Sequence, residues 1–447
     1  MNFSICLSIF FKKSNTIDFF CPFFPYFLLI CNSNIRRYDI RNKKKTNNRI
    51  SKGKCKMKSL MEREKDTFFQ VYKRLPIEVD RAEGCRVYAK DGSVYLDFLA
   101  GIAVNALGHS HPAIVDAVCE QAKKYMHISN YFYQEPQIKL AEKLKEMSGM
   151  DRVFFSNSGT EATEGAIKLA RRYGSQCDKI DIIAFSGGFH GRTYGALSVM
   201  DKPQYKDKMG PYLSNTKVIE YNNVDELRAT VNDKTAAVIL EFIQGEGGIT
   251  SATQEFIDEM VSLREKFGFL IIADEIQAGS GRSGKFAAYQ HFGVRPDVVT
   301  LAKGMGGGMP LGAILATEAL AGIWDKGMHG TTYGGNAVAC AAGFAVLNEL
   351  ENGVLANTNE LGQYLKSKLD ETMARFPGKV SEVRGRGLML GLLLTFDAAE
   401  LVAEMLKHKV ISNAASGKVL RIVPPLTITK ADADEFISVL HKCLEVI

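Results

Sequence analysis

Paired cysteine spacings, which zinc sites and disulfide frameworks use, are missing from this chain of 447 residues. Four of its nine cysteines lie within the first 55 residues. The other five are scattered and form no Cys-x-x-Cys motif: Cys85, Cys119, Cys177, Cys340 and Cys443. Scattered cysteines indicate reduced thiols rather than disulfides or metal ligands. We therefore expect no metal site and a cytoplasmic location.

A hydrophobic run long enough to cross a membrane is also missing from the N-terminal region. The apolar patch at residues 19–30 is shorter than the ~20 residues that a membrane span needs, and Pro22 and Pro25 interrupt it. An organellar or secretory presequence stays open because the region is poor in acidic residues, although no small-residue cleavage site follows. We favour a disordered or mis-started tail over residues 1–61, without stable membrane insertion.

Basic charge is in excess only in this tail. Residues 1–61 hold thirteen Lys and Arg against two Asp, an excess of +11, so the remaining chain carries −5 of the overall +6. The body of the protein is therefore mildly acidic. A basic excess confined to the tail gives no reason to expect a nucleic-acid partner.

The body has the composition and patterning of a globular α/β protein with two domains. With 46% hydrophobic residues and 40 glycines, it can bury a large core. Residues 62–99 show short alternating strands with a hairpin signal at Asp91-Gly92, and we assign them to the N-terminal part of a small α+β domain. Residues 100–336 alternate strand-like and helical patterns, which predicts a large, doubly wound, mostly parallel or mixed sheet. Residues 337–447 are assigned to the C-terminal part of the small domain.

Five apolar runs in the large domain are each followed by polar or glycine-rich sequence. The runs cover residues 153–155, 182–185, 237–243, 269–273 and 298–302. Continuous apolar runs fit strands that are buried on both faces of a parallel sheet. Ligands bind beyond the carboxyl ends of such strands, so we expect the residues after the five runs to line one crevice.

Lys303 and Asp274 follow two of these runs and point to one chemistry. An amine freed from solvent can form a Schiff base with an aldehyde, and a carboxylate can keep a heterocyclic nitrogen protonated. Pyridoxal phosphate needs both groups. Taken alone, Lys303 could be a solvated loop residue and Asp274 a helix N-cap.

The first two strand ends offer a phosphate site and a ring contact. Gly159 and Thr160 begin a helical pattern whose free amides would favour an anion, although such a sequence is often only a cap. Phe189 could stack on a planar ring, and Arg192 could bind a carboxylate through two hydrogen bonds. The ordinary alternative is a glycine-rich loop with a packed Phe and an exposed Arg. We assign His190 to packing or hydrogen bonding rather than to catalysis.

Two further polar residues belong to the same set of strand ends. Glu246 lies among glycines after the third run, where it could pair with a mobile Arg or simply form part of a turn. Gln277 lies one helical turn beyond Asp274 and could contact a ring oxygen. Each signal is modest, but five of them at successive strand ends form a strong combination.

These residues resemble those of the class III pyridoxal-phosphate-dependent aminotransferases, which have fold type I. The resemblance runs from about Glu64 to Ile447. Five stretches carry it: Leu96–Pro112, Phe189–Thr193, Gln244–Gly248, Asp274–Gln277 and Gly330–Asn336. It implies that Lys303 forms the Schiff base and then transfers protons, and that Asp274 pairs with the pyridinium nitrogen. It further implies that Gln277 contacts the ring hydroxyl and that Phe189 stacks on the ring face. Gly159 and Thr160 would bind the phosphate.

The resemblance also implies how substrates and a second subunit take part. Arg192 would hold the distal carboxylate of the substrate, with Thr331 nearby. Arg421 would bind the α-carboxylate of glutamate or 2-oxoglutarate, and Glu246 would mask it when the other substrate is bound. Thr332 would reach the phosphate in the neighbouring subunit, so that a complete site requires a homodimer.

Ile102 bears on the choice of amino donor. Ornithine aminotransferases of this family carry a Tyr there that holds the free α-ammonium, so an aliphatic residue favours a donor whose α-amine is acylated. We expect transfer of the terminal amino group of N2-acetylornithine to 2-oxoglutarate, in arginine biosynthesis. Succinylornithine, succinyl-diaminopimelate, ornithine and 4-aminobutyrate stay open as donors. An alternative of another class is a non-catalytic protein that binds pyridoxal phosphate or attaches to a membrane.

Overall fold

The computed structural model describes residues 58–447, and the predictions for residues 1–57 lie outside this range. Helix α1 (Leu60–Thr67) begins with a capping box. The Ser59 hydroxyl accepts a hydrogen bond from the Glu62 amide, and the Glu62 carboxylate accepts one from the Ser59 amide. Leu60 and Met61, which we assigned to the tail, are therefore the first residues of a helix.

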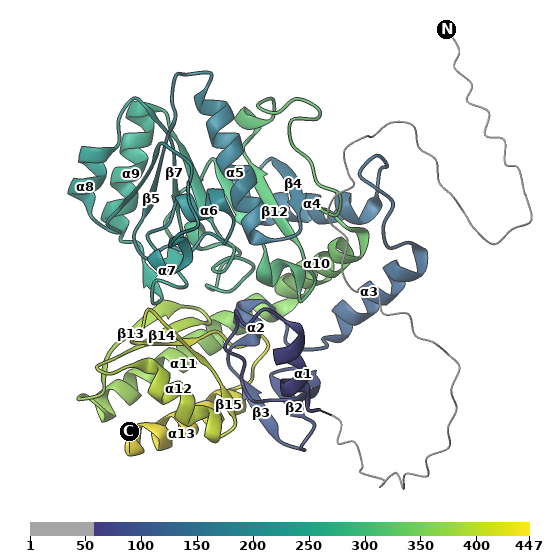
Figure 1. The fold of residues 1–447 in the computed structure, drawn as a ribbon, viewed down its shortest axis with the longest axis vertical. Coiled ribbons are helices and arrows are strands. Elements are labelled where there is room, and N and C mark those ends of the chain that lie inside the picture. The colour runs from purple at the N-terminus through teal and green to yellow at the C-terminus, as the bar shows by residue number, and fades with distance from the viewer. Residues whose placement is uncertain (1–57) are drawn as a thin grey trace, which may run out of the picture. The chain divides into compact units, whose positions relative to one another are not determined.

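A seven-stranded mixed sheet has the strand order β4-β12-β11-β10-β7-β5-β6 (Figure 1). Its strands are β4 (Arg152–Ser156), β5 (Asp181–Phe185), β6 (Thr216–Ile219), β7 (Thr235–Leu240), β10 (Leu270–Asp274), β11 (Val298–Leu301) and β12 (Gly312–Ala316). Only β12 runs against the others, because it pairs antiparallel with both β4 and β11. The five predicted runs correspond to β4, β5, β7, β10 and β11, so their carboxyl ends share one edge.

The central strands are buried along their whole length, which explains their continuous apolar sequence. Every residue of β7, β10, β11 and β12 is buried. Helix α5 (Gly159–Gly174) packs against β4, β7, β11 and β12. Further helices of this region are α3 (Pro112–Lys124), α4 (Glu135–Ser148), α6 (Tyr194–Ser198), α7 (Pro203–Lys206), α8 (Val224–Thr230) and α9 (Gln254–Phe267).

Two four-stranded sheets complete the fold, and one of them joins distant parts of the chain. It contains β1 (Val79–Glu83), β2 (Arg86–Ala89), β3 (Val94–Asp97) and β15 (Val410–Ile411), and β15 pairs parallel with β3. The predicted hairpin is confirmed, because β2 and β3 pair antiparallel around a turn in which the Ser93 amide donates to Asp91. The boundaries that we assigned to the two domains stay a prediction.

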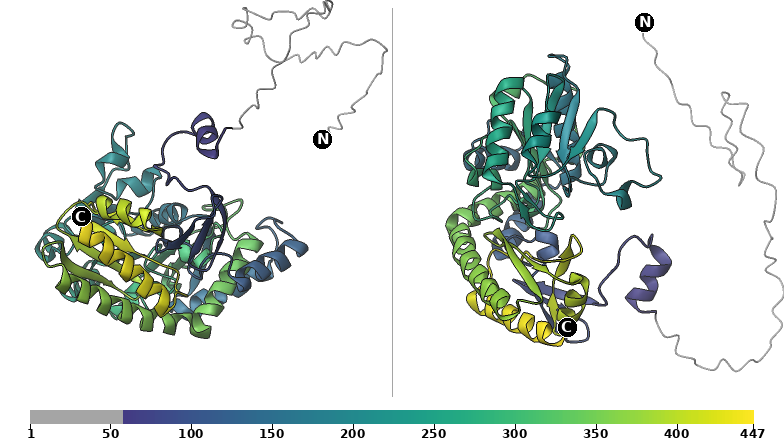
Figure 2. Two further views of the ribbon diagram at one scale, coloured as in Figure 1. Left: turned by 90° about the horizontal axis from the view of Figure 1, so that it is seen from below. Right: turned by 90° about the vertical axis from the view of Figure 1, so that its left-hand side faces the viewer.

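The second small sheet has the order β13-β14-β17-β16. Its strands are β13 (Val380–Arg386), β14 (Met389–Leu394), β16 (Asn413–Ala415) and β17 (Val419–Ile422). Three helices pack on or beside it: α11 (Leu355–Arg375), α12 (Ala398–Lys407) and α13 (Lys430–Val446) (Figure 2). The short strands β8 (Ile243–Gln244) and β9 (Thr250–Ser251) form a separate antiparallel pair.

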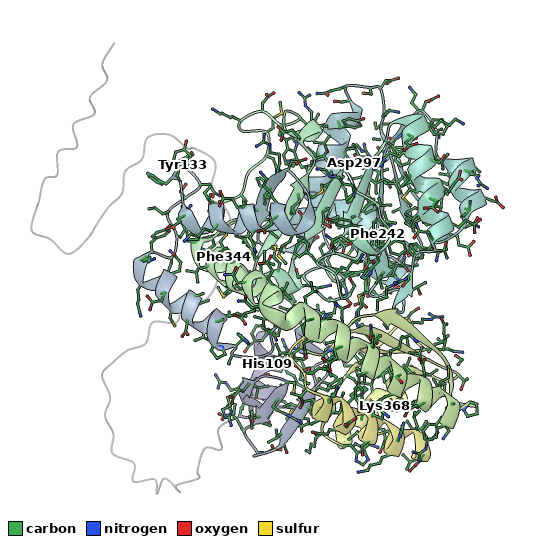
Figure 3. The ribbon with its side chains drawn as sticks, turned by 180° about the vertical axis from the view of Figure 1, so that it is seen from behind. His109, Tyr133, Phe242, Asp297, Phe344 and Lys368 are labelled. Carbon is green, nitrogen blue, oxygen red and sulfur yellow. The ribbon has the colours of Figure 1, made fainter. Side chains whose placement is uncertain are left out.

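A long helical stretch connects the large sheet with this second small sheet. Helix α10 (Ala337–Glu349) continues through one π-helical turn into α11, and Figure 3 labels Phe344 and Lys368 along it. By length and composition, residues 337–375 are the one stretch of the described chain that could span a membrane. The core helices of soluble proteins can be equally long and apolar, and α10 buries eight of its thirteen residues.

Candidate active site

Asp274 ends β10 and is only 2% exposed. One carboxylate oxygen lies 2.6 Å from Nδ1 of His190. The other accepts hydrogen bonds from the Ile276 amide at 3.1 Å and from the Thr300 hydroxyl at 3.4 Å. No α-helix follows Asp274, so the helix-cap alternative is wrong, and Gln277 lies in a turn rather than one helical turn along. A buried carboxylate with three donors is held firmly at the edge of the sheet.

The hydrogen-bonding role expected for His190 is confirmed, because the buried imidazole contacts Asp274. Burial lowers the pKa of its imidazole, but the hydrogen bond and the charge of Asp274, helped by Glu241, raise the pKa overall. Glu241 is buried beside it and accepts hydrogen bonds from the amides of Phe189 and Gly245. Burial, and then the charge of Asp274, raise the pKa of Glu241 to about 7. The carboxylates of Asp274 and Glu241, at the ends of β10 and β7, thus both raise the pKa of the His190 imidazole.

Lys303 follows β11 and begins a short 3-10 helix with φ of 39°. Its amine has no hydrogen-bond or ion-pair partner within residues 58–447. Burial lowers the pKa of Lys303, and the charge of Arg421 lowers it further, while Glu241, Asp274 and Glu246 act in the opposite direction. A lysine with a lowered pKa holds more of its amine in the neutral, nucleophilic form.

The start of α5 carries the predicted phosphate site. The hydroxyl of the N-cap residue Ser158 accepts from the Glu161 amide, which leaves the amides of Gly159 and Thr160 without an acceptor in the described chain. The hydroxyls of Thr160 and Thr193 lie 2.8 Å apart, which ties the helix to the loop that carries Arg192. Free amides at a helix start favour an anion.

Phe189 and Arg192 lie on the loop after β5. The Phe189 ring meets the Tyr205 ring edge-on, with centroids 6.0 Å apart. The Arg192 guanidinium lies 3.6 Å from the centroid of the Tyr205 ring. Arg192 is exposed and has no carboxylate partner among the described residues. Its stacked guanidinium is therefore available to an anionic ligand.

Arg421 lies in β17 and is 1% exposed, although it carries a full charge. Its Nη1 lies 2.5 Å from the Glu246 carboxylate and 3.3 Å from the Gln277 side-chain oxygen. Its Nε donates to Asn413 at 3.1 Å. Glu246, on the β8–β9 turn, is much less buried than Arg421. The structure thus places a buried cation against a carboxylate on a loop.

Thr331 and Thr332 lie on the segment before α10, and they differ in surroundings. The Thr331 hydroxyl accepts from the Asn157 side chain at 3.3 Å and from the Gly334 amide at 3.0 Å. Thr331 is therefore close to the start of α5. Thr332 is exposed, and its side chain makes no hydrogen bond within residues 58–447.

Ile102 belongs to a short turn, α2 (Ala100–Ala103), whose four residues all have positive φ, from 51° to 63°. Left-handed backbone is costly for residues other than glycine, and such strain concentrates at functional sites. A Cβ added to Gly304 would lie 3.6 Å from the Ala103 carbonyl oxygen, so the turn adjoins the Lys303 loop. Ile102 itself is 42% exposed.

These residues fit pyridoxal phosphate, the cofactor that the resemblance implies. An unpartnered amine, a buried carboxylate and a helix start with free amides are the groups that an aldehyde, a ring nitrogen and a phosphate require. The backbone also leaves little room for side chains around the helix start. A Cβ added to Gly159 would lie 2.9 Å from Ile276.

The family assignment rests on the length of chain that matches. Residues 68–444 match the family Aminotransferase class-III. This chain belongs to the class III aminotransferases. Structures of relatives describe bound pyridoxal phosphate, as in the ornithine aminotransferase from Toxoplasma gondii. The protein is thus a pyridoxal-phosphate-dependent aminotransferase of fold type I.

Individual relatives cover nearly the whole of the described chain. Acetylornithine aminotransferase from Caldanaerobacter subterraneus is 45% identical over 386 residues, which are 85% of this chain and 98% of the relative. The enzyme of that name from Methanocaldococcus jannaschii is 43% identical over 383 residues, 85% of this chain and 96% of the relative. A crystal structure of the Toxoplasma gondii ornithine aminotransferase has a TM-score of 0.84 and 28% identity, covering 88% of this chain and 96% of that one.

Proposed function

We propose that this aminotransferase moves the terminal amino group of N2-acetylornithine to 2-oxoglutarate, giving N-acetylglutamate 5-semialdehyde and glutamate, in arginine biosynthesis. Relatives that carry this activity in their names, at 40–45% identity, support the choice of substrate. The contact between Arg421 and Glu246, together with an Arg192 that has no carboxylate partner in the described chain, is the observation that carries the proposal.

The two arginines match the needs of two different substrates. 2-Oxoglutarate brings two carboxylates, which Arg192 and Arg421 can each bind. Acetylornithine presents its reacting end without a carboxylate, so a buried Arg421 would then lack a counter-charge. Leaving such a charge unpaired costs about 2–5 kcal/mol. Glu246 neutralises Arg421 in that half-reaction and moves away in the other.

Each cofactor-facing residue has a role that its surroundings support. The cofactor supplies an electron sink that stabilises negative charge on the substrate carbon. Lys303 would take the proton from that carbon and deliver it to the carbon on the other side of the transferred nitrogen, which its lowered pKa assists. Asp274, held by His190, keeps the ring nitrogen protonated. The helix start at Gly159 and Thr160 fixes the phosphate.

The remaining contacts orient the ring and the donor. Phe189 would stack on the ring face, and Gln277 would contact the ring hydroxyl. Thr331 lies near the distal carboxylate that Arg192 binds. Ile102, at the strained turn beside the Lys303 loop, gives the donor an aliphatic neighbour in place of a hydrogen-bonding one.

A substrate panel tests the proposal. The value of kcat/KM for acetylornithine should exceed that for ornithine by about tenfold or more, because the free α-ammonium of ornithine would lack a partner beside Ile102 and an unpaired charged group costs about 1–3 kcal/mol. 4-Aminobutyrate, which has no α-amine, is a further donor in the comparison. Succinylornithine and succinyl-diaminopimelate belong in the same panel, since both also present an acylated amine. Preference for free ornithine would overturn the interpretation of Ile102. No turnover with any donor would favour a non-catalytic binding protein.

Glu246→Gln is the matched variant for this panel, because it keeps the shape of the side chain and removes its charge. We expect kcat/KM for acetylornithine to fall while that for 2-oxoglutarate stays unchanged or rises. An equal fall for both substrates would show that Glu246 has only a structural role.

We also propose that the enzyme is a cytoplasmic homodimer in which Thr332 reaches the phosphate of the neighbouring subunit. The exposed Thr332 lies in a surface rich in exposed apolar side chains, namely Met126, Ile128, Tyr131, Phe132, Tyr133 and Tyr333. The two segments adjoin, since Asn130 donates to the Thr331 and Gly334 carbonyls. Tyr133 points outward from the chain just before α4 (Figure 3). Such surfaces mark protein interfaces.

Sedimentation of the wild type and of a variant with one added charge, Tyr133→Glu, tests the dimer. The holoenzyme should sediment with twice the mass of the chain. Tyr133→Glu should shift it toward monomers and release cofactor, because a charge buried in an interface is costly. A wild-type monomer that keeps full activity would contradict the proposal. Cell fractionation tests the cytoplasmic location.

A further inference from the structure

A second cavity, of about 680 Å³, lies apart from the residues assigned to the active site. Its walls come from β9, from the segment after β10, from α11 and from β13. Polar and charged side chains dominate these walls, including Ser283, His291, Lys366, Glu382, Arg384 and Arg386. None of the residues assigned to cofactor or substrate lines it, so it requires an explanation of its own.

The cavity carries an excess of positive charge. Three cations line it against one carboxylate, that of Glu382. Glu382 pairs with Arg384 at 2.6 Å, and Lys366 pairs with Asp370 at 3.0 Å. Arg386 is exposed and has no ion-pair partner within residues 58–447. One arginine of the cavity is thus free to bind an anion.

Ser283 adds a buried donor that the protein leaves unused. Its side chain is 1% exposed, and its hydroxyl has no hydrogen-bond partner in the described chain. A buried polar group without a partner costs about 1–3 kcal/mol, so such groups are rare unless something binds them. His291 lies beside it and faces the Ser283 carbonyl at 3.0 Å. Ser283 and the exposed Arg386 line the same cavity.

We propose that this cavity is a binding site for a small oxyanion ligand, a carboxylate or phosphate metabolite. The planar guanidinium of Arg386 can form two parallel hydrogen bonds to either group. Ser283, whose buried hydroxyl has no partner in the described chain, is in the wall of the cavity, and Gln363 lies on the α11 side. The Asn359 amide is already used, because it donates to the Gly284 and Leu355 carbonyls. The volume of the cavity is within the range of small-molecule sites.

The site also connects to the loop that carries Glu246. Arg384 Nη1 donates to the Gly248 carbonyl at 3.4 Å, and Thr250 and Ser251 of β9 line the cavity. Glu246 lies two residues before Gly248 on the same turn. A bound anion competes with the Gly248 carbonyl for the Arg384 guanidinium. Loss of that hydrogen bond loosens the turn, and this turn must move when Glu246 leaves Arg421. This step rests on the proposed function, whereas binding itself does not.

Calorimetric titration of the holoenzyme tests binding, with inorganic phosphate and succinate as separate probes. We expect Arg386→Ala to weaken binding of the preferred anion by about tenfold to a hundredfold, the usual value of a hydrogen bond to a charged group. Ser283→Ala should weaken it less. Arg172→Ala is the matched control, because Arg172 is also exposed and without an ion pair in the described chain but lies on α5. The Arg172→Ala variant should bind the anion with the same affinity as the wild type.

Each outcome of the titration decides the proposal. Binding that Arg386→Ala weakens supports the site, whether one probe binds or both, and the probe that binds more tightly identifies the ligand as a phosphate or a carboxylate. Absence of binding by both probes overturns it. Binding that survives Arg386→Ala unchanged also overturns it, because the anion is then bound in the active site. Unaltered turnover of Arg386→Ala without added anion shows that the variant is folded.

A kinetic measurement then tests the connection to the active site. The bound anion should lower the KM for 2-oxoglutarate and raise that for acetylornithine, because Glu246 then leaves Arg421 more readily, and Arg386→Ala should remove both effects. Equal changes in both KM values, or none, would refute the connection while the binding result stands. Failure of the proposed function would appear differently, as a lack of turnover with acetylornithine.

Discussion

Replacing Lys303 by alanine should reduce kcat by at least about a thousandfold. The substitution removes both the nucleophile for the cofactor aldehyde and the group that transfers the proton, and a positioned acid-base group alone contributes about 10²- to 10⁴-fold. Lys303 has no protein partner to lose within the described chain, so the fold should be unaffected. The measurements are glutamate-dependent turnover and the visible absorption of the holoenzyme, both of which should change.

Two controls separate chemistry from folding in this experiment. Lys326→Ala removes an exposed lysine and should leave turnover and absorption as in the wild type. Added methylamine should partly restore turnover to Lys303→Ala, since a soluble amine can occupy the space of the lost side chain and carry the proton. Unchanged turnover and absorption in Lys303→Ala would show that another residue bears the role we assign to it.

The strand ends were predictable from the sequence because burial on both faces makes a strand continuously apolar. β10 and β11 follow this rule along their whole length. The direction of a strand leaves no such mark, so the antiparallel β12 could not be recognised in advance. Its reversed direction still leaves β4 parallel to β11, which keeps the start of α5 on the same edge as Lys303.

The partner of His190 could not be predicted because Asp274 is 84 residues away in sequence. A lone histidine in a glycine-rich loop looks the same whether it packs or holds a catalytic carboxylate. The available signal was its place at a strand end, between Phe189 and Arg192. Glu241 lies within the third apolar run, and only the fold shows that it is buried together with His190.

The turn at Ile102 shows a different limit. Four successive left-handed residues form it, yet only Gly101 favours that backbone. Local preference predicts an ordinary turn or helix, and tertiary contacts override it. The anion cavity is similar in this respect, because Ser283, Lys366 and Arg386 are far apart in sequence and no motif joins them.

Asp274→Asn is the second substitution with a large expected effect. An amide keeps the shape of the carboxylate but cannot hold the ring nitrogen protonated, so the cofactor loses much of its capacity as an electron sink. Removing one electrostatic contact of this kind costs about 10²- to 10³-fold in kcat. The variant should still bind the cofactor, because Lys303 and the start of α5 are unchanged. Turnover and the visible spectrum test this, and a kcat within a few-fold of wild type would exclude the role.

The stability of the same variant tests whether His190 and Asp274 form a charged pair. In the wild type the folded pKa of His190 is raised, so protonation of His190 stabilises the fold. That contribution is fully present below the unfolded pKa of about 6.5 and is lost as the pH rises through the folded pKa. Without Asp274, burial dominates and lowers the pKa of His190.

The difference in Tm between wild type and Asp274→Asn should therefore widen as the pH falls. Glu241 acts in the same direction, because the charge of Asp274 helps to raise its pKa to about 7. A folded carboxyl with a raised pKa also gains stability at low pH, and the variant loses part of that gain. A Tm difference that does not depend on pH would show that His190 is neutral beside Asp274, and that its contact is a hydrogen bond without charge.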